Sequence, residues 1–537
     1  MPDITFLRDD QRVSITVEKG MSLLEAARKS GILLESPCNG SGSCGKCKVK
    51  ILQRQDIVLA CTEFAEADMT VEILDRQDSH NVQIVQHGAD LDIAVDSAVS
   101  KRYHPGSHTT EVWIDQVLQG VEPGDTTGES FGLVVDIGTT TLVAALFDLV
   151  TGREAASAAS LNPQSHHAQD VLSRIKYASG KEGLTVMHTE FISVLNRMID
   201  DLVLQAGIKA SRIYELVFSG NTCMLHLALG VDPAPLGRYP YIPAITGGWS
   251  YPARDYGIPV NDWAKVYLPP VMSAYVGADI TSGILAAGLK QQAGLTLFVD
   301  VGTNGEMVLA ADGGLIATST AAGPAFEGMN ITYGMRASPG AIEKFMVAGD
   351  GTVTLQTIGE REPIGICGSG LLDIVGELVK HGLIQKTGRL QPAPDRPELA
   401  GRLVKKDGKT VFAVADAVYL TQKDIRQVQL AKGAIRAGIE ALLAKNKVLP
   451  EAVHRVYIAG SFGYHLNPES LIHIGMLPQE FHNKIEFLGN TSKTGGQAFL
   501  LNHPARQAIR GVVDEVEVLE LATMDNFDQL FVRCLNF

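Results

Sequence analysis

Residues 134–140 read VVDIGTT, and residues 298–304 read FVDVGTN. Each copy is a short apolar run that leads to an aspartate, a glycine and a threonine. A second apolar run follows each copy, at 142–147 and at 307–310. Apolar runs of this length, interrupted by Asp and Gly, are typical of buried strands joined by a tight turn. The repeat therefore predicts two strand–turn–strand units, each of which opens one half of a duplicated α/β region.

The two Asp-x-Gly-Thr turns are candidate phosphate-binding sites. Glycine at such a turn lets backbone N–H groups face an anion, and threonine hydroxyls add further donors. Asp136 and Asp300 can hold Mg²⁺ or orient an attacking water. A third related segment, AGSFG at 459–463, follows another apolar run, and no G-x4-G-K-[S/T] loop of a P-loop ATPase occurs. We expect the two hairpins to face each other and to clamp the β- and γ-phosphates of ATP.

Four of the seven cysteines cluster near the N-terminus. Their spacing is Cys38-x5-Cys44-x2-Cys47-x13-Cys61. An odd, clustered count in a large chain indicates a cofactor site better than a disulfide framework. Four thiolates in one small domain can hold a [2Fe-2S] cluster, and the glycines of the intervening loop let the backbone wrap closely around it. A structural zinc site stays the alternative, although three ligands crowd one loop here while structural zinc usually sits between paired knuckles.

The residues around the cysteines follow a strand and helix pattern. Apolar and polar residues alternate over 13–17, which predicts a strand. An S-x-x-E capping box that begins at Ser22 predicts the start of a short helix, and 49–51 and 71–73 read as further strands. Strand, helix, cysteine loop and strand are the order of a β-grasp ferredoxin, which we place at residues 1–78.

Composition limits the class of protein. The 537 residues carry a net charge of -14, and 45% of them are hydrophobic. This predicts several packed domains and argues against a general nucleic-acid or anionic-membrane binder. No secretory signal and no apolar run near the ~20 residues of a membrane span is evident. We therefore expect a cytoplasmic location.

These motifs resemble a known family. Residues 37–47 (PCNGSGSCGKC) with 59–61 (LAC) look like a [2Fe-2S] ferredoxin domain, and the paired Asp-Gly-Thr turns resemble the superfamily of actin, sugar kinases and heat-shock chaperone ATPases. Both together are similar to the reductive activators of corrinoid-dependent methyltransferase proteins. Further segments carry the likeness to that family: 162–164, 170–175, 220–224, 277–279, 323–328, 334–337 and 366–370.

The resemblance implies a multidomain fold. An α+β β-grasp ferredoxin domain at 1–78 would precede a duplicated α/β actin-like (ribonuclease H-like) ATPase with halves at 131–295 and 296–537. Residues 79–130, interrupted by Pro and Gly, are interpreted as a linker or small bridging unit.

The resemblance also implies the site residues. Cys38, Cys44, Cys47 and Cys61 would bind the cluster, and Asp136 and Asp300 would act in catalysis with Mg²⁺. The residues expected to bind ATP are Gly138, Thr139, Thr140, Gly302, Thr303, Asn304, Gly368, Ser369, Gly370, Gly460, Ser461 and Gly463.

Three residues near these motifs have more than one interpretation. Glu327 and Arg336 lie in glycine-rich loops, where contacts with phosphate or with a partner and an internal ion pair are equally expected. His226 follows apolar residues and is interpreted as a core histidine rather than a cobalt ligand.

The activity implied by the resemblance is ATP-dependent reductive activation of a corrinoid protein of a methyltransferase system. One electron from the [2Fe-2S] cluster would reduce Co(II) to Co(I). A reduced ferredoxin, a flavodoxin or a reductase would supply the electron, and a homodimer is compatible with the family. Two alternatives stay open: a redox-sensing ATPase or kinase of the actin-like superfamily with a regulatory cluster, and a ferredoxin-type shuttle with a degenerate ATPase.

Overall fold

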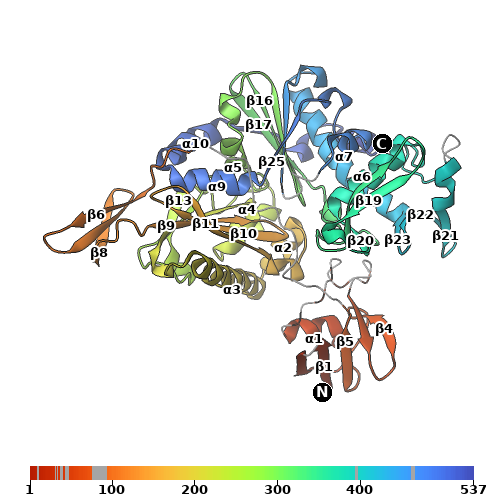
Figure 1. Cartoon of the computed structure of the whole chain (residues 1–537), viewed down its shortest axis with the longest axis horizontal. Coiled ribbons are helices and arrows are strands. Elements are labelled where there is room, and N and C mark those ends of the chain that lie inside the picture. Colours follow the sequence, from red (N-terminus) through yellow and green to blue (C-terminus); the bar gives the residue numbers. More distant parts are fainter. Residues whose placement is uncertain are drawn as a thin grey trace.

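The computed structural model describes residues 1–8, 11–30, 32, 34, 36, 40, 42, 47–74, 93–392, 397–460 and 466–537. Of the site residues marked by the sequence, Cys38, Cys44, Ser461 and Gly463 lie outside these residues. The described chain forms a small N-terminal sheet domain, a three-stranded ribbon and two larger lobes (Figure 1).

The N-terminal domain is a five-stranded sheet of order β2-β1-β5-β3-β4. Strand β1 pairs antiparallel with β2 and parallel with β5, and β3 pairs antiparallel with β4 and β5. Ser22 caps helix α1 by accepting the Glu25 N–H at 3.2 Å, and Leu23 and Ala27 of the helix share a buried core with Phe6. The predicted β-grasp arrangement is confirmed. Its elements are β1 (Asp3–Arg8), β2 (Gln11–Thr16), α1 (Leu23–Lys29), β3 (Lys48–Ile51), β4 (Asp56–Leu59) and β5 (Met69–Ile73).

The first lobe is built on a six-stranded sheet of order β11-β10-β9-β12-β14-β13. Strands β9, β10 and β11 form an antiparallel meander, and β12 and β14 run parallel to β9. Helices α2, α3 and α4 contribute to a buried core with this sheet. Its elements are β9 (Phe131–Ile137), β10 (Thr141–Asp148), β11 (Glu154–Leu161), α2 (Val171–Ala178), α3 (Lys181–Ala206), β12 (Ile213–Gly220), α4 (Thr222–Ala228), β13 (Trp249–Pro252) and β14 (Lys265–Leu268).

The second lobe repeats this plan. Its sheet has the order β25-β24-β15-β16-β17-β26, with β15, β16 and β17 as the meander and β24 and β25 parallel to β15. The duplication predicted from the two Asp-x-Gly-Thr turns is therefore confirmed. Its main elements are β15 (Thr296–Val301), β16 (Gly305–Ala311), β17 (Gly314–Thr320), α6 (Gly368–Lys380), α7 (Gln422–Lys445), β24 (Arg455–Ala459), α8 (Pro468–His473), β25 (Ile485–Gly489), β26 (Glu517–Val518) and α11 (Phe527–Cys534).

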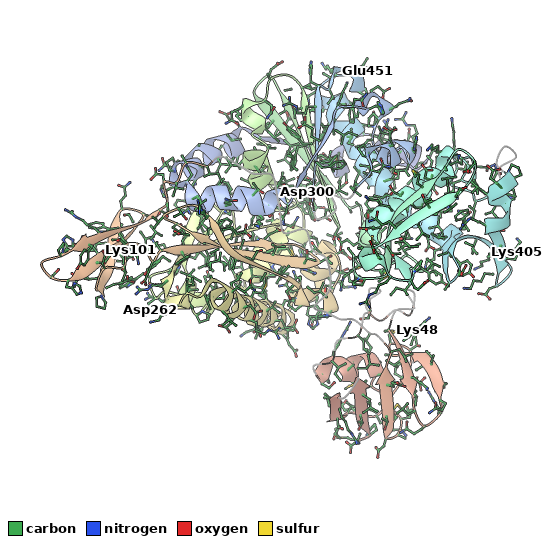
Figure 2. The ribbon with its side chains drawn as sticks, in the orientation of Figure 1. Lys48, Lys101, Asp262, Asp300, Lys405 and Glu451 are labelled. Atoms are coloured by element: carbon green, nitrogen blue, oxygen red, sulfur yellow. The ribbon has the colours of Figure 1, made fainter. Side chains whose placement is uncertain are left out.

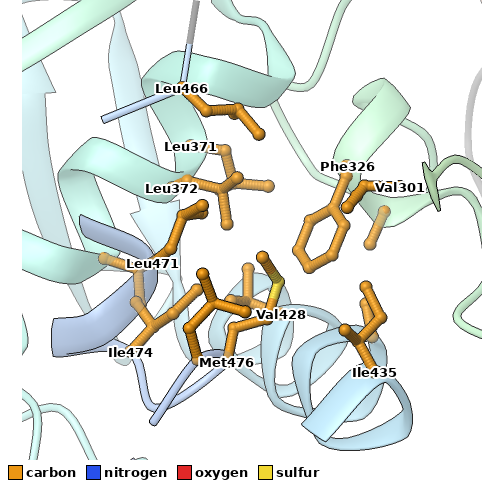
Figure 3. Close-up of a cluster of buried hydrophobic side chains, with 14 of the residues drawn as sticks. Val301, Phe326, Leu371, Leu372, Val428, Ile435, Leu466, Leu471, Ile474 and Met476 are labelled. Carbon is orange, nitrogen blue, oxygen red and sulfur yellow. The ribbon is translucent and has the colours of Figure 1, made fainter. Parts of the chain in front are cut away.

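Two small sheets extend the second lobe. They have the orders β19-β18-β20 and β21-β22-β23. The first of them packs on helix α6, and both contribute to the large core of this lobe. Figure 3 shows part of that core, in which Phe326 lies among apolar side chains of α6 and α7. Their strands are β18 (Ala341–Val347), β19 (Val353–Thr357), β20 (Gly365–Ile366), β21 (Leu403–Lys406), β22 (Lys409–Ala415) and β23 (Val418–Thr421).

A layer of helices separates the two main sheets: α5 (Ala278–Ala286), α9 (Thr491–Leu501) and α10 (His503–Glu515) (Figure 1). Helices α5 and α9 lie so close together that a Cβ added at Gly495 would be 2.1 Å from the Ser282 carbonyl oxygen. Helix α9 comes late in the chain, yet it packs on β9 and β12 of the first lobe. The C-terminal part of the chain thus completes the first lobe.

Residues within the stretch interpreted as a linker or bridging unit form a three-stranded antiparallel ribbon of β6 (Val99–His104), β7 (Thr109–Ile114) and β8 (Val117–Pro123). A buried ion cluster attaches the ribbon to the first lobe. Lys101 Nζ lies 3.1 Å from Glu122 Oε2 and 2.7 Å from the Tyr214 hydroxyl of β12, and Arg212 donates to Glu122 at 2.9 Å. Partners on both sides offset the cost of burying these charges.

The longest helices, α3 and α7, have 26 and 24 residues. Each mixes apolar and charged residues along its length. None of the helices in the described ranges combines enough length with enough apolar character to cross a bilayer.

Candidate functional site

The predicted phosphate loops face each other across one cavity between the lobes. The turn between β9 and β10 and the turn between β15 and β16 both line it. Gly138 is required in the first turn, since a Cβ there would lie 2.7 Å from the Thr141 carbonyl oxygen. The predicted residues that the structure brings to this cavity are Asp136, Gly138, Thr139, Thr140, Asp300, Gly302, Thr303, Asn304 and Gly460. Figure 2 shows Asp300 near the centre of the molecule, where the lobes meet.

Gly460 reaches the cavity from the end of β24. Its φ of 105° favours glycine, and a Cβ there would lie 2.4 Å from the Val301 carbonyl oxygen and 2.9 Å from Asp300 Oδ1. A side chain at this position would thus displace the second phosphate loop.

Five carboxylates line the cavity: Asp136, Asp279, Asp300, Glu306 and Glu327. Burial raises the pKa of Asp300 to about 8 and that of Asp279 to about 7, and repulsion from neighbouring carboxylates acts in the same direction. Burial also raises the pKa of Asp136 and Glu306. Carboxylates gathered in this way favour a cation among them.

Asp136 is held by the N-terminal turn of α9. Asn490 Nδ2 donates to its Oδ2 at 2.8 Å, and the Ser492 hydroxyl donates to its Oδ1 at 2.7 Å. Asn490 also caps α9 by accepting the Lys493 N–H at 2.8 Å. The orientation of this first-lobe aspartate therefore depends on a helix from the C-terminal part of the chain.

The donor set fits Mg²⁺ bound together with phosphate. Hard oxygen ligands suit this ion, which proteins commonly hold through one or two carboxylates plus substrate phosphates and waters. Within the described ranges no three His, Cys, Asp or Glu side chains form a ready-made metal site. Phosphate oxygens and water would thus complete the coordination.

A buried arginine positions the first phosphate loop. Arg174 of α2 donates to the carbonyl oxygens of Thr139 and of Ala168, and to Gln164 Oε1 at 3.2 Å. Asn162 adds a bond from its Nδ2 to the Gly138 carbonyl oxygen at 2.7 Å. The loop backbone is therefore fixed from behind by side chains that do not themselves line the cavity.

Three predicted nucleotide-binding residues do not line this cavity. Gly368, Ser369 and Gly370 form the first turn of α6 and are buried inside the second lobe. A Cβ at Gly370 would lie 2.1 Å from the Ile342 carbonyl oxygen of β18, so this glycine lets the helix meet the sheet.

Sequence reasoning missed several polar residues of the cavity, among them Asp279, Glu306, Asn490 and Ser492. Asp279 lies in a segment that carried the family likeness, but no role was assigned to it, and Glu306 follows the second turn directly. Asn490 and Ser492 carry no sequence signal, because they lie far along the chain from Asp136 and only the packing of α9 brings them there.

Two of the four cysteines predicted to bind a cluster, Cys47 and Cys61, lie within the described residues and flank one hairpin. Cys47 precedes β3 and Cys61 follows β4, and the Ala60 N–H donates to the Cys47 carbonyl oxygen at 2.7 Å. Both cysteine side chains are buried. Gly40, with a φ of 86°, approaches the same point, since its added Cβ would lie 3.9 Å from Cys61 Cβ. The hairpin thus explains the long final spacing, and the thiols and glycine fit a cluster site.

His226 has a core position, as its sequence context indicates. It is fully buried, its Nδ1 lies 2.8 Å from the Thr222 carbonyl oxygen, and its Nε2 accepts the Ala244 N–H at 3.1 Å. Both ring nitrogens are satisfied inside the first lobe, so no cobalt ligand is expected here.

Comparisons with known proteins agree with this architecture. Residues 6–70 match the "2Fe-2S iron-sulfur cluster binding domain", 131–292 the "RACo middle region" and 294–537 the "C-terminal domain of RACo the ASKHA domain". The solved structure of a "Reductive activator for corrinoid,iron-sulfur protein" is 30% identical, with a TM-score of 0.76, and the match covers 100% of this chain and 98% of that one. The chain belongs to the family of reductive activators of corrinoid proteins.

Other members of this family are similar over much of their length. The "Corrinoid activation enzyme RamQ" of Eubacterium limosum is 28% identical over 97% of both chains. The "[Co(II) methylated amine-specific corrinoid protein] reductase" of Methanosarcina barkeri is 26% identical over 76% of this chain and 77% of its own. The predicted combination of a ferredoxin domain with an actin-like ATPase fold is thereby confirmed.

Proposed function

We propose that this protein is an ATP-dependent reductive activator that transfers one electron from a [2Fe-2S] cluster to a corrinoid protein and reduces Co(II) to Co(I). One observation carries the proposal. The chain combines a [2Fe-2S]-type domain with a carboxylate-lined cleft between two lobes. Its whole length matches the solved structure of a reductive activator.

The cluster would be held by Cys38, Cys44, Cys47 and Cys61, and when bound it supplies a single electron. Cys47 and Cys61 are brought together by the β3–β4 hairpin and are shielded from solvent. Hydrogen bonding and limited solvent access around such sulfurs tune the potential of a cluster.

The cleft supplies the ATP chemistry. The hydroxyls of Thr139, Thr140 and Thr303 and the turn N–H groups provide donors to phosphate. Asp136 and Asp300 would hold Mg²⁺, directly or through water, and orient the attacking water, while Asp279 and Glu306 supply further carboxyl groups that would lose protons as the ion binds.

Reduction of Co(II) by the cluster is expected to be thermodynamically unfavourable, and ATP would supply the free energy. For one electron, ~59 mV corresponds to a tenfold shift in equilibrium, so an uphill gap of ~250 mV costs roughly 6 kcal/mol. We propose that closure of the lobes on ATP changes the complex with the corrinoid protein, so that Co(II) becomes easier to reduce. A reduced ferredoxin, flavodoxin or reductase in the cytoplasm would refill the cluster, and the active form would be a homodimer.

The test is formation of Co(I), followed by its absorbance, with a purified corrinoid protein and an excess of reduced donor. The wild-type protein should form Co(I) only with Mg-ATP. Asp300→Asn should abolish ATP-dependent formation of Co(I) and keep the visible iron–sulfur spectrum. Cys61→Ser should bleach that spectrum and keep nucleotide binding. Equal reduction without ATP would overturn the coupling, and failure with every corrinoid protein would favour a redox-sensing ATPase.

A further inference from the structure

Glu327 belongs to the second lobe and reaches into the cavity between the β9–β10 and β15–β16 turns. It ends a short 3₁₀ turn, Pro324–Glu327, that follows β17. The preceding Phe326 is only 1% exposed and belongs to the same buried core as Val301 and Leu371 (Figure 3). Gly328, with a φ of 78°, must be glycine, because a Cβ there would lie 2.5 Å from the Met335 carbonyl oxygen. The backbone on both sides of Glu327 is thus held in place.

The carboxylate of Glu327 joins the two phosphate loops. Thr140 of the β9–β10 turn donates its hydroxyl to Glu327 Oε2, and Thr303 of the β15–β16 turn donates its hydroxyl to Oε1. Thr140 belongs to the first lobe and Thr303 to the second. One carboxylate therefore connects the lobes at the turns where phosphate is expected.

The space left beside this bridge is small. The cavity lined by the two turns and by Glu327 has a volume of ≈ 110 Å³. Pockets for small molecules commonly measure ~300–1,000 Å³. A metal ion and part of a phosphate chain fit this space, and the rest of a nucleotide would lie outside it.

We propose that Glu327 is an anionic latch. In the nucleotide-free protein its carboxylate takes the place of a phosphate and holds the two hairpins together, and a nucleotide must displace it to reach the same threonine hydroxyls. This inference rests on the proposed binding of ATP in this cleft, because both anions compete for one set of donors.

With this latch, nucleotide binding is coupled to a change in the contact between the lobes, because the nucleotide must displace Glu327. Displaced Glu327 loses two hydroxyl donors and faces like charge on the phosphates. The turn that carries Thr140 is then released from Glu327, and phosphate lies between the two turns instead. The empty and the nucleotide-bound protein thereby differ in the relation of their lobes.

The experiment measures nucleotide affinity of the full chain by titration with a fluorescent ATP analogue and Mg²⁺. Glu327→Gln keeps the shape of the side chain, removes its charge and leaves only one oxygen to accept a hydroxyl. The latch predicts that this variant binds nucleotide about tenfold more tightly than wild type. Glu182→Gln, which removes an exposed carboxylate on α3, should leave the affinity unchanged.

A second measurement follows the lobes without nucleotide. Amide hydrogen exchange in residues 138–141 should be faster in Glu327→Gln than in wild type, and also faster in Glu327→Asp, whose shorter side chain keeps the charge but cannot span both threonines. Unchanged or weaker binding by Glu327→Gln, or unchanged exchange, would overturn the latch. Wild-type protein that binds no nucleotide at all would instead refute the proposed function.

Discussion

Burial decides the protonation of the carboxylates in the cleft. The pKa of Asp300 is raised to about 8 and that of Asp279 to about 7, first because they are buried and then because they face other carboxylates. A raised pKa means that the folded protein binds more protons than the unfolded chain between about pH 4 and these values. Stability is therefore greatest below this window and is lost as the pH rises through it.

We predict that the melting temperature of the metal-free protein falls between pH 6 and pH 8.5. Asp300 alone should contribute a loss of about 2 kcal/mol over this range, since each pH unit between the two pKa values costs about 1.4 kcal/mol. Asp300→Asn should flatten the profile, and saturating Mg-ATP should suppress the loss in wild type. Scanning calorimetry over this range is the measurement, and a profile that rises with pH would contradict the assignment.

Arg174 is a second residue on which the site depends. Its guanidinium is fully buried and donates to the carbonyl oxygens of Thr139 and Ala168. Burial lowers its pKa to about 10, so it stays charged near neutral pH.

Arg174→Met should fill the same space and leave those carbonyl groups without a donor. Unpaired buried polar groups cost about 1–3 kcal/mol each, so unfolding in urea should show a loss of roughly 2–4 kcal/mol. Nucleotide affinity should also fall, because the first phosphate loop loses its support. An equal loss of stability with unchanged affinity would show that Arg174 supports the fold alone.

At the scale of elements, close contact between helices α5 and α9 assembles the first-lobe side of the cleft. Asp279 is the second residue of α5, and Asn490 and Ser492 begin α9 and hold Asp136. Gly495 permits the approach, since any side chain there would overlap the Ser282 carbonyl group. Because Gly495 has no side chain, α5 and α9 can pack closely, and this packing places Asp279 near Asn490 and Ser492.

Gly495→Ala should therefore destabilise the protein by about 1–3 kcal/mol, as overpacking of a core does, and weaken nucleotide binding. Gly511→Ala in α10 is the matched control, because nothing lies within 4 Å of its added Cβ. That variant should gain about 0.5–1 kcal/mol from helix propensity. Thermal melting and nucleotide titration of both variants provide the comparison, and equal behaviour would refute the role of close packing.

At the scale of the whole molecule, a path of contacts leads from the cleft to the cluster domain. Asn162 bonds to the carbonyl oxygens of Gly138 and Thr140, and it begins the 3₁₀ turn Pro163–His166. The carbonyl oxygen of His166 accepts a hydrogen bond from Arg28 of helix α1 at 2.8 Å. A continuous series of hydrogen bonds thus connects the first phosphate loop with the N-terminal domain through one short turn.

Arg28→Ala should weaken this docking by about 1.5 kcal/mol, equivalent to roughly a tenfold shift between docked and undocked forms. Small-angle scattering should show a larger radius of gyration, while nucleotide affinity stays the same. Lys29→Ala, an exposed neighbour on the same helix, should leave the scattering unchanged. If both variants scatter like wild type, the contact does not hold the domain.

The sequence by itself determined that a [2Fe-2S]-type domain begins the chain, the β-grasp order and the duplicated strand–turn–strand units. These features are local, because strand alternation, helix capping and glycine turns depend on neighbouring residues. Only the tertiary structure placed Asn490 and Ser492 on Asp136, joined Glu327 to Thr140, and kept Gly368–Gly370 away from the cleft. Those pairings come from the packing of elements far apart in the chain, which depends on the shapes of whole helices and sheets and leaves no short sequence motif.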